Sequence, residues 1–61
     1  MKKMYLIRYE VSKACCRLAM CKSREDALAL AKEKDAIVFK HIYKLSADGS
    51  RYYALSYKKI Y

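Results

Sequence analysis

The stretch SREDALALAKEK, residues 23–34, predicts a helix and separates two β-rich halves of the chain. Ser23 is a favourable N-cap, and Asp26 stands three positions later, as in a variant of the capping box. Apolar residues from Ala27 to Ala31 follow near helical spacing. Acidic residues occupy the first turn and lysines the last, which suits the helix dipole.

Before this helix, residues 4–11 and 14–21 alternate in the manner of two β-strands. An even loop around Ser12-Lys13, of two or four residues, would place Tyr9 opposite Cys16. That register gathers the apolar residues of both strands on one face, whereas an odd loop would divide them. Ser12-Lys13 is poor chemistry for a type I′ turn, which favours the four-residue loop.

After the helix, residues 36–45 and 51–60 predict a second hairpin. A three-residue loop, Ala47-Asp48-Gly49, fits a type I turn followed by a left-handed Gly49. This register would put one alternating set on the core face of the sheet: Ile37, Phe39, His41, Tyr43, Leu45, Tyr53, Leu55 and Tyr57. The opposite set would form an open face: Val38, Lys40, Ile42, Lys44, Tyr52, Ala54, Ser56 and Lys58.

The expected fold is therefore α+β: a single domain over residues 1–61 with the order ββαββ. Its four strands would form an antiparallel sheet with one helix packed on one face. A domain of about 60 residues buries only about 60% of its unfolded surface, so its stability is marginal. A homodimer that uses the open face of the sheet is an alternative source of stability. The longest uncharged run is six residues, Tyr52 to Tyr57, which predicts no membrane span.

Charge is distributed unevenly along the chain. The net charge is +8, yet residues 24–35 hold three basic and four acidic residues, so the excess lies on the strands, turns and termini. Arg8 would lie opposite Arg17 across the first hairpin, a like-charge pair that an anion or a partner would relieve. Such a surface suits phosphate backbones or acidic proteins. The predicted binding residues are Arg8, Arg17, Lys40, Lys44, Tyr52 and Lys58.

Aromatic composition adds a second expectation. Seven residues are Tyr, and five of them fall on the predicted core face, where their rings would pack beneath the helix. Tyr52 and Tyr61 are better candidates for contact with a partner.

The sequence gives little support for a catalytic or metal-binding site. His41 is the single histidine, and on an apolar strand we expect it to be packed and hydrogen-bonded. The three cysteines, Cys15, Cys16 and Cys21, lack the spacing of a zinc site and indicate reduced thiols in a cytoplasmic setting. Nothing places an acid beside a Cys–His pair. We therefore expect no catalytic residue, no metal and no cofactor.

The order of elements resembles that of small phage-encoded proteins that disable host machinery. The resemblance lies in the tyrosine-bearing opening MKKMYLI (residues 1–7), the capped helix start KSREDALALA (residues 22–31) and the terminal hairpin over 36–60. One type I-F anti-CRISPR family looks like this, as does a phage inhibitor of bacterial RNA polymerase. The resemblance implies docking onto a CRISPR effector or RNA polymerase in the host cytoplasm. It carries over no individual functional residue.

Two functions from different classes follow. The first is a non-enzymatic, anti-CRISPR-like protein that occludes a nucleic-acid or protein-docking surface of a nucleic-acid-handling complex. The alternative is a DNA- or RNA-binding module that uses a basic, Tyr-bearing sheet face. Neither needs a cofactor or a membrane.

Overall fold

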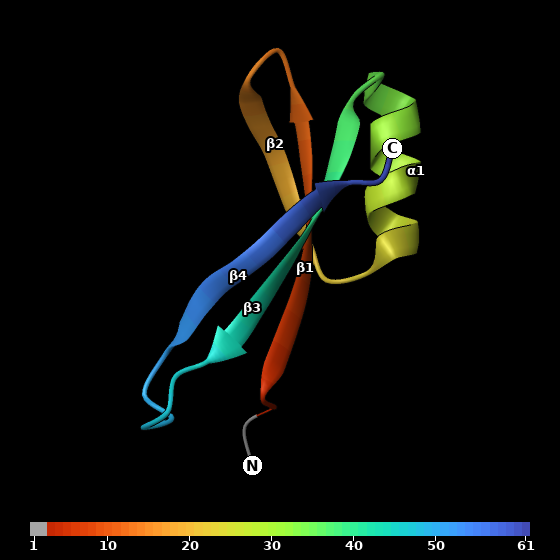
Figure 1. The fold of residues 1–61 in the computed structure, drawn as a ribbon. Coiled ribbons are helices and arrows are strands. Elements are labelled where there is room, and N and C mark those ends of the chain that lie inside the picture. The colour runs from red at the N-terminus through yellow and green to blue at the C-terminus, as the bar shows by residue number, and fades with distance from the viewer. Residues whose placement is uncertain (1–2) are drawn as a thin grey trace.

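A computed structural model describes residues 3–61 and gives one sheet and one helix (Figure 1). The elements are β1 (Tyr5–Lys13), β2 (Cys16–Cys21), α1 (Arg24–Lys34), β3 (Ile37–Leu45) and β4 (Tyr52–Lys59). The strands are antiparallel and lie in the order β2-β1-β3-β4. The predicted ββαββ fold with one open antiparallel sheet is confirmed.

The helix begins and ends as its sequence predicts. Ser23 has an extended backbone, and its Oγ accepts a hydrogen bond from the Asp26 N–H at 3.4 Å. Asp35 ends the helix in the left-handed conformation, and the Ala36 N–H donates to the Ala31 carbonyl at 2.8 Å. These contacts turn the chain sharply into β3.

The first hairpin turns two residues later than expected. Lys13 pairs with Cys16, so Ala14 and Cys15 form a two-residue turn in which both φ angles are positive, at 53° and 64°. Two positive φ angles are those of a type I′ turn, which matches strand twist but normally selects Asn or Gly. The predicted four-residue loop and the pairing of Tyr9 with Cys16 are therefore wrong: Tyr9 lies opposite Cys21.

A bulge in the first hairpin completes this correction. The register shifts between Val11 and Ser12, and Arg17 lies opposite Ser12. Arg8 instead lies opposite His41 of β3. The expected like-charge pair of Arg8 with Arg17 is not formed.

The second hairpin has a longer turn than predicted. The Ser46 N–H donates to the Arg51 carbonyl at 2.8 Å, which closes a loop of four residues rather than three. Gly49 adopts the expected left-handed conformation, with φ of +75°. Asp48 Oδ1 accepts hydrogen bonds from Ser46 Oγ at 2.6 Å and from the Ser50 N–H at 3.0 Å and Oγ at 2.8 Å. These hydrogen bonds, that of Ser46 first, lower the pKa of Asp48 to about 2.

A second bulge changes the pairing of the last hairpin but restores part of the predicted division of its residues between the two faces. Because the turn is one residue longer, Lys44 lies opposite Tyr53. The register then shifts between Tyr43 and Ile42, so that His41 lies opposite Tyr57. His41 and Tyr57 share a face as predicted, whereas Tyr53 lies on the other face.

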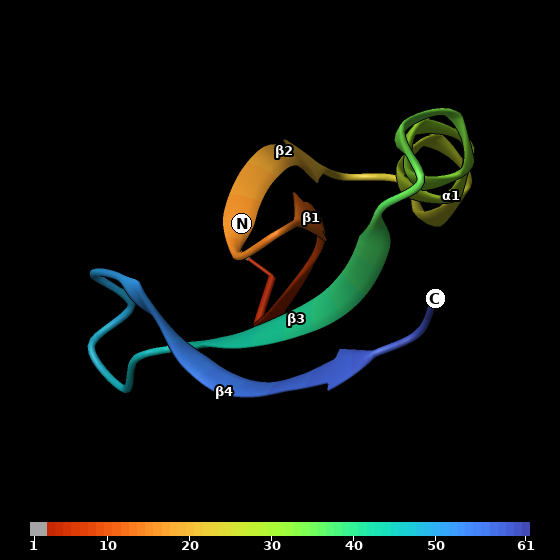
Figure 2. The same ribbon diagram turned by 90° about the horizontal axis from the view of Figure 1, so that it is seen from above.

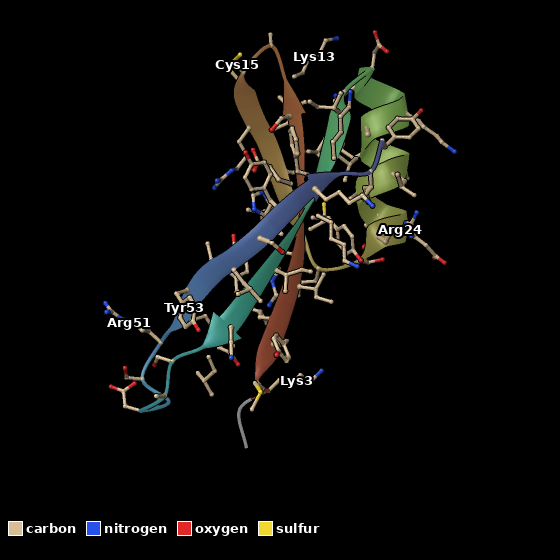
Figure 3. The ribbon with its side chains drawn as sticks, viewed as in Figure 1. Lys3, Lys13, Cys15, Arg24, Arg51 and Tyr53 are labelled. Atoms are coloured by element: carbon tan, nitrogen blue, oxygen red, sulfur yellow. The ribbon has the colours of Figure 1, made fainter. Side chains whose placement is uncertain are left out.

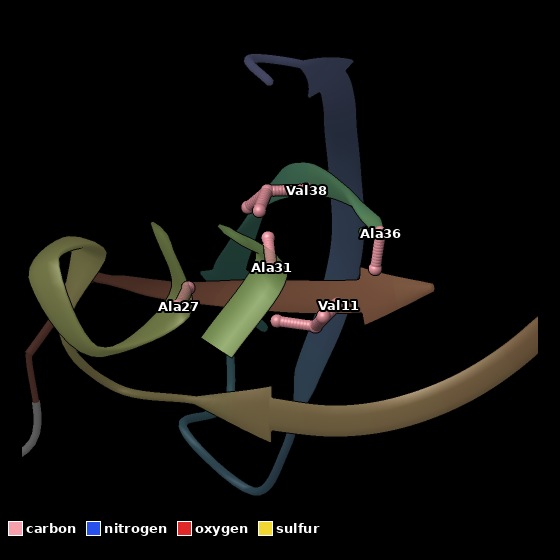
Figure 4. Packing of buried hydrophobic residues seen from close by; sticks show 5 residues of the cluster. All are labelled: Val11, Ala27, Ala31, Ala36 and Val38. Carbon is pink, nitrogen blue, oxygen red and sulfur yellow. The ribbon is translucent and has the colours of Figure 1, made fainter. Parts of the chain in front are cut away.

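The core is small and lies on the expected face of β1, around Val11, but on the face of β3 that was expected to be open. Val11 and Val38 are directly paired and fully buried. Ala27 and Ala31 of the helix pack against them (Figure 4). The alanines allow the helix to approach closely, and the two β-branched valines fill the narrow space. The expectation that Phe39 and the tyrosines of the last hairpin pack beneath the helix is wrong, because alternation points Phe39 away from Val38.

The helix covers only one end of a long sheet. The molecule measures 40 × 21 × 15 Å, and α1 lies beside the end of the sheet nearest the β1–β2 turn (Figures 1 and 2). The opposite end, where β1 begins and the β3–β4 turn lies, has no helix over either face. Within residues 3–61, no helix has the length and apolar character needed to cross a membrane.

Candidate binding surface

The face of the sheet that points away from α1 carries a row of rings. We call Phe39, His41, Tyr43 and Tyr57 the aromatic face. The His41 ring is stacked on those of Tyr43 and Tyr57, with centroids 6.1 and 5.8 Å apart. Phe39 meets the Tyr57 ring edge-on at 5.9 Å. Tyr57 is 70% exposed, so a flat group from another molecule can reach its ring.

A single acidic residue, Glu10, anchors the centre of this face. Its Oε1 lies 2.7 Å from His41 Nε2, and its Oε2 accepts a hydrogen bond from Ser12 Oγ at 2.6 Å. Arg17 Nε is 3.7 Å from the same oxygen. Glu10, Phe39, His41 and Tyr57 line a shallow hollow of about 250 Å³. The expected packing and hydrogen bonding of His41 are confirmed, but the acid beside it was not foreseen.

The contacts of Glu10 favour its charged form. The hydrogen bond from Ser12 lowers the pKa of Glu10 most, partial burial opposes this, and His41 and Arg17 lower it further. A carboxyl whose pKa is lowered on folding stabilises the fold above its unfolded pKa. That contribution is lost as the pH falls through the lower, folded pKa.

We therefore expect Glu10→Gln to flatten the acid side of the stability profile. Urea unfolding of the wild type and the variant, measured from pH 7 down to pH 3, should show two curves that differ at pH 7 and converge on acidification. Glu33→Gln, on the exposed surface of α1, is the control and should stay parallel to the wild type. A constant difference between the Glu10→Gln and wild-type curves at every pH would contradict the role given to Glu10.

The predicted binding residues do not share one face. Arg8 and Arg17 lie on the side of the aromatic face, opposite His41 and Ser12 respectively. Tyr52 lies on that side too, beyond the bulge, and its hydroxyl donates to the Lys3 carbonyl at 2.6 Å.

The other three predicted residues form a separate set on the side of α1. Lys40 lies opposite both Tyr9 and Lys58, and Lys44 lies opposite Tyr5. We call Lys40, Lys44 and Lys58 the lysine row. The single open face predicted for all six residues is wrong, because Val38, and with it every second residue of β3, faces the helix. Lys40 and Lys58 are a directly opposed like-charge pair, which an anion would relieve.

Sequence reasoning missed the aromatic face as a surface. Phe39, His41 and Tyr57 were assigned to the core because they alternate with charged residues. Lys59, which lies opposite Phe39, was not considered. The available signal was that both faces of β3 carry apolar residues, with Val38 and Ile42 among lysines on one of them, so one helix had to leave some apolar residues uncovered.

Ser12 contributes the hydroxyl of the cluster around Glu10. Ser12 donates to Glu10 rather than to the imidazole, so the serine–histidine contact that would activate a hydroxyl is not formed. Cys15 and Cys16 are exposed at the first turn and Cys21 is half-buried, all as free thiols. Over residues 3–61, no three His, Cys, Asp or Glu side chains gather as metal ligands would.

Comparison with known proteins adds no relative. No protein-family model matches the chain, and neither the curated proteins nor the solved structures give a significant match.

Proposed function

We propose that this chain is a non-enzymatic basic binding protein that acts on nucleic acid or on a complex that handles it. Of these targets, single-stranded nucleic acid fits the sheet best. The observation that carries the proposal is the aromatic face, whose half-buried rings support the exposed ring of Tyr57 on a chain of net charge +8.

Both components of single-strand recognition are present on this sheet. Bases stack on exposed aromatic rings regardless of sequence, and Tyr57 offers such a ring. Basic side chains follow the phosphates, and Arg8, Arg17 and Lys59 flank the rings on the same side. The bases of duplex DNA are stacked on one another and cannot stack on Tyr57. A duplex would therefore contact only the basic side chains and bind less tightly.

Fluorescence anisotropy tests this proposal with labelled oligothymidine, oligouridine and a DNA duplex. Single strands should bind more tightly than the duplex. If three or four phosphates are neutralised, the affinity should fall about 20- to 50-fold between 50 and 200 mM salt. Equal affinity for duplex and single strand would remove the role of the rings. No binding at 50 mM salt would refute direct recognition of nucleic acid.

A second candidate is the occlusion of a docking surface on a nucleic-acid-handling complex, such as a CRISPR effector or RNA polymerase in a host cytoplasm. The lysine row supports this candidate, because Lys40 and Lys58 are a directly opposed like-charge pair that an acidic protein surface would relieve. This candidate is favoured if oligonucleotides do not bind while the protein co-purifies with such a complex. Lys40→Glu with Lys44→Glu should then abolish inhibition and retain the fold.

A further inference from the structure

Strand β1 is paired on both sides over only half of its length. It pairs with β3 from Tyr5 to Ser12, but β2 reaches no further than Cys21, opposite Tyr9. After Cys21 the chain leaves the sheet and enters α1. Among the described strands, none pairs with the outer side of β1 over Tyr5–Arg8, and Figure 1 shows this end of β1 with β3 on one side only.

The hydrogen bonds identify which main-chain groups face this open edge. The Leu45 N–H donates to the Met4 carbonyl at 2.7 Å, so Met4 faces β3. In a β-strand the N–H and C=O of alternate residues point to the same side, which directs those of Tyr5 and Ile7 to the open edge. The Arg8 guanidinium supports this assignment, because its Nη1 donates to the Ile7 carbonyl at 2.8 Å.

A basic hollow lies beside the open edge. It has a volume of about 530 Å³ and is lined by residues Tyr5 to Arg8 together with Lys3, Lys22 and Tyr52. Lys3 and Lys22 are exposed, and no carboxylate is among the residues that line this hollow. The edge therefore combines main-chain donors and acceptors with a positive surround.

We infer that the open edge of β1 binds an extended acidic peptide as an added strand, in line with β2. Main-chain hydrogen bonds to Tyr5 and Ile7 would provide the pairing, and Lys3, Arg8 and Lys22 would select acidic side chains. The incoming strand would displace the Arg8 guanidinium from the Ile7 carbonyl and leave it to bind a carboxylate. A second copy of this chain fits less well, because pairing two such edges would bring their cations together.

This inference is independent of the proposed function, and amide hydrogen exchange followed by NMR tests it. In the free protein, the Tyr5 and Ile7 amides should exchange about tenfold faster than those of Leu6 and Arg8, which face β3, since each lacks one hydrogen bond. Equal protection of the two pairs would overturn the inference. So would protection of Tyr5 and Ile7 that grows with protein concentration, because a second copy would then fill the edge.

The probe is an acetylated, amidated six-residue peptide of alternating Glu and Val. Its addition should slow exchange at Tyr5 and Ile7 specifically. The same peptide with all of its backbone amides N-methylated keeps its charge but has no backbone N–H along either edge, and it should not slow this exchange. Equal protection by the methylated peptide, or by oligothymidine of equal charge, would show that the edge is only a site for polyanions and would overturn the inference.

A matched pair of charge reversals checks the peptide selectivity. Lys3→Glu with Lys22→Glu should weaken peptide binding about tenfold, because two exposed attractions become repulsions. Lys32→Glu with Lys34→Glu on α1 makes the same change in net charge and should weaken binding less than about twofold. Equal losses in the two double variants would contradict selection by Lys3 and Lys22.

Discussion

Replacing Val38 by Asp should leave the chain unfolded in water at 25 °C. Val38 is fully buried and pairs with Val11 beneath the helix alanines. A domain of this length has about 3 to 9 kcal/mol of stability. Burying an uncompensated carboxylate costs several kcal/mol, which is comparable with that whole stability. Far-UV circular dichroism and urea titration would show the loss of the cooperative transition.

Two further variants separate the burial of Val38 from a general effect of substitution. Val38→Ala should remain folded but lose about 2 kcal/mol, since it removes two methyl groups from a packed site. Leu55→Asp makes a comparable polar change at a residue of β4 that is 51% exposed, and it should cost less than about 1 kcal/mol. A cooperative, near-wild-type transition in Val38→Asp would contradict the assignment of the core.

Replacing Tyr57 by Ala should weaken single-strand binding about tenfold, because stacking of a base on an aromatic ring is worth about 1–3 kcal/mol. The loss should be the same at 50 and 200 mM salt, since a ring neutralises no phosphate. The substitution should leave the fold intact, because Tyr57 is 70% exposed. Anisotropy with oligothymidine at both salt concentrations would measure it.

Tyr53→Ala is the matched control for this prediction. Tyr53 belongs to the same strand, near the β3–β4 turn (Figure 3), and is 45% exposed. It lies opposite Lys44, on the other side of the sheet from Tyr57. Tyr53→Ala should change the affinity less than about twofold, because Tyr53 lies outside the aromatic face. Equal losses in the two variants would mean that the aromatic face is not the contact surface.

The order of elements could be predicted because each has a local signal. Ser23 and Asp26 mark the helix start, and Gly49 marks the second turn through its left-handed backbone. The first turn could not be located, because Ala14 and Cys15 adopt positive φ angles that neither residue type favours. The ladder between β1 and β2 extends to the pair of Lys13 with Cys16, which confines the turn to these two residues.

The faces of the sheet could not be assigned from alternation alone. In β3, Ile37, Phe39 and Tyr43 belong to the more apolar face, which predicts that the helix covers that face. The helix instead covers the face on which Val38 is followed by Lys40 and Lys44. The choice depends on the pairing of Val38 with Val11, a contact between residues 27 positions apart. Because the face of β3 was assigned wrongly, the predicted binding residues fall on two sides of the sheet. The same error assigned the rings of the aromatic face to the core.

The position of the helix at one end of the sheet also determines which part of the molecule unfolds locally. Val11, Val38 and the alanines of α1 join the elements at that end into one cooperative unit. The far end depends on strand pairing, the Asp48 turn and the bond from the Tyr52 hydroxyl to Lys3. That end should open locally, at a lower free energy than global unfolding, while the helix remains docked. A ligand that binds there would rigidify the far end and so extend the cooperative unit along the whole sheet.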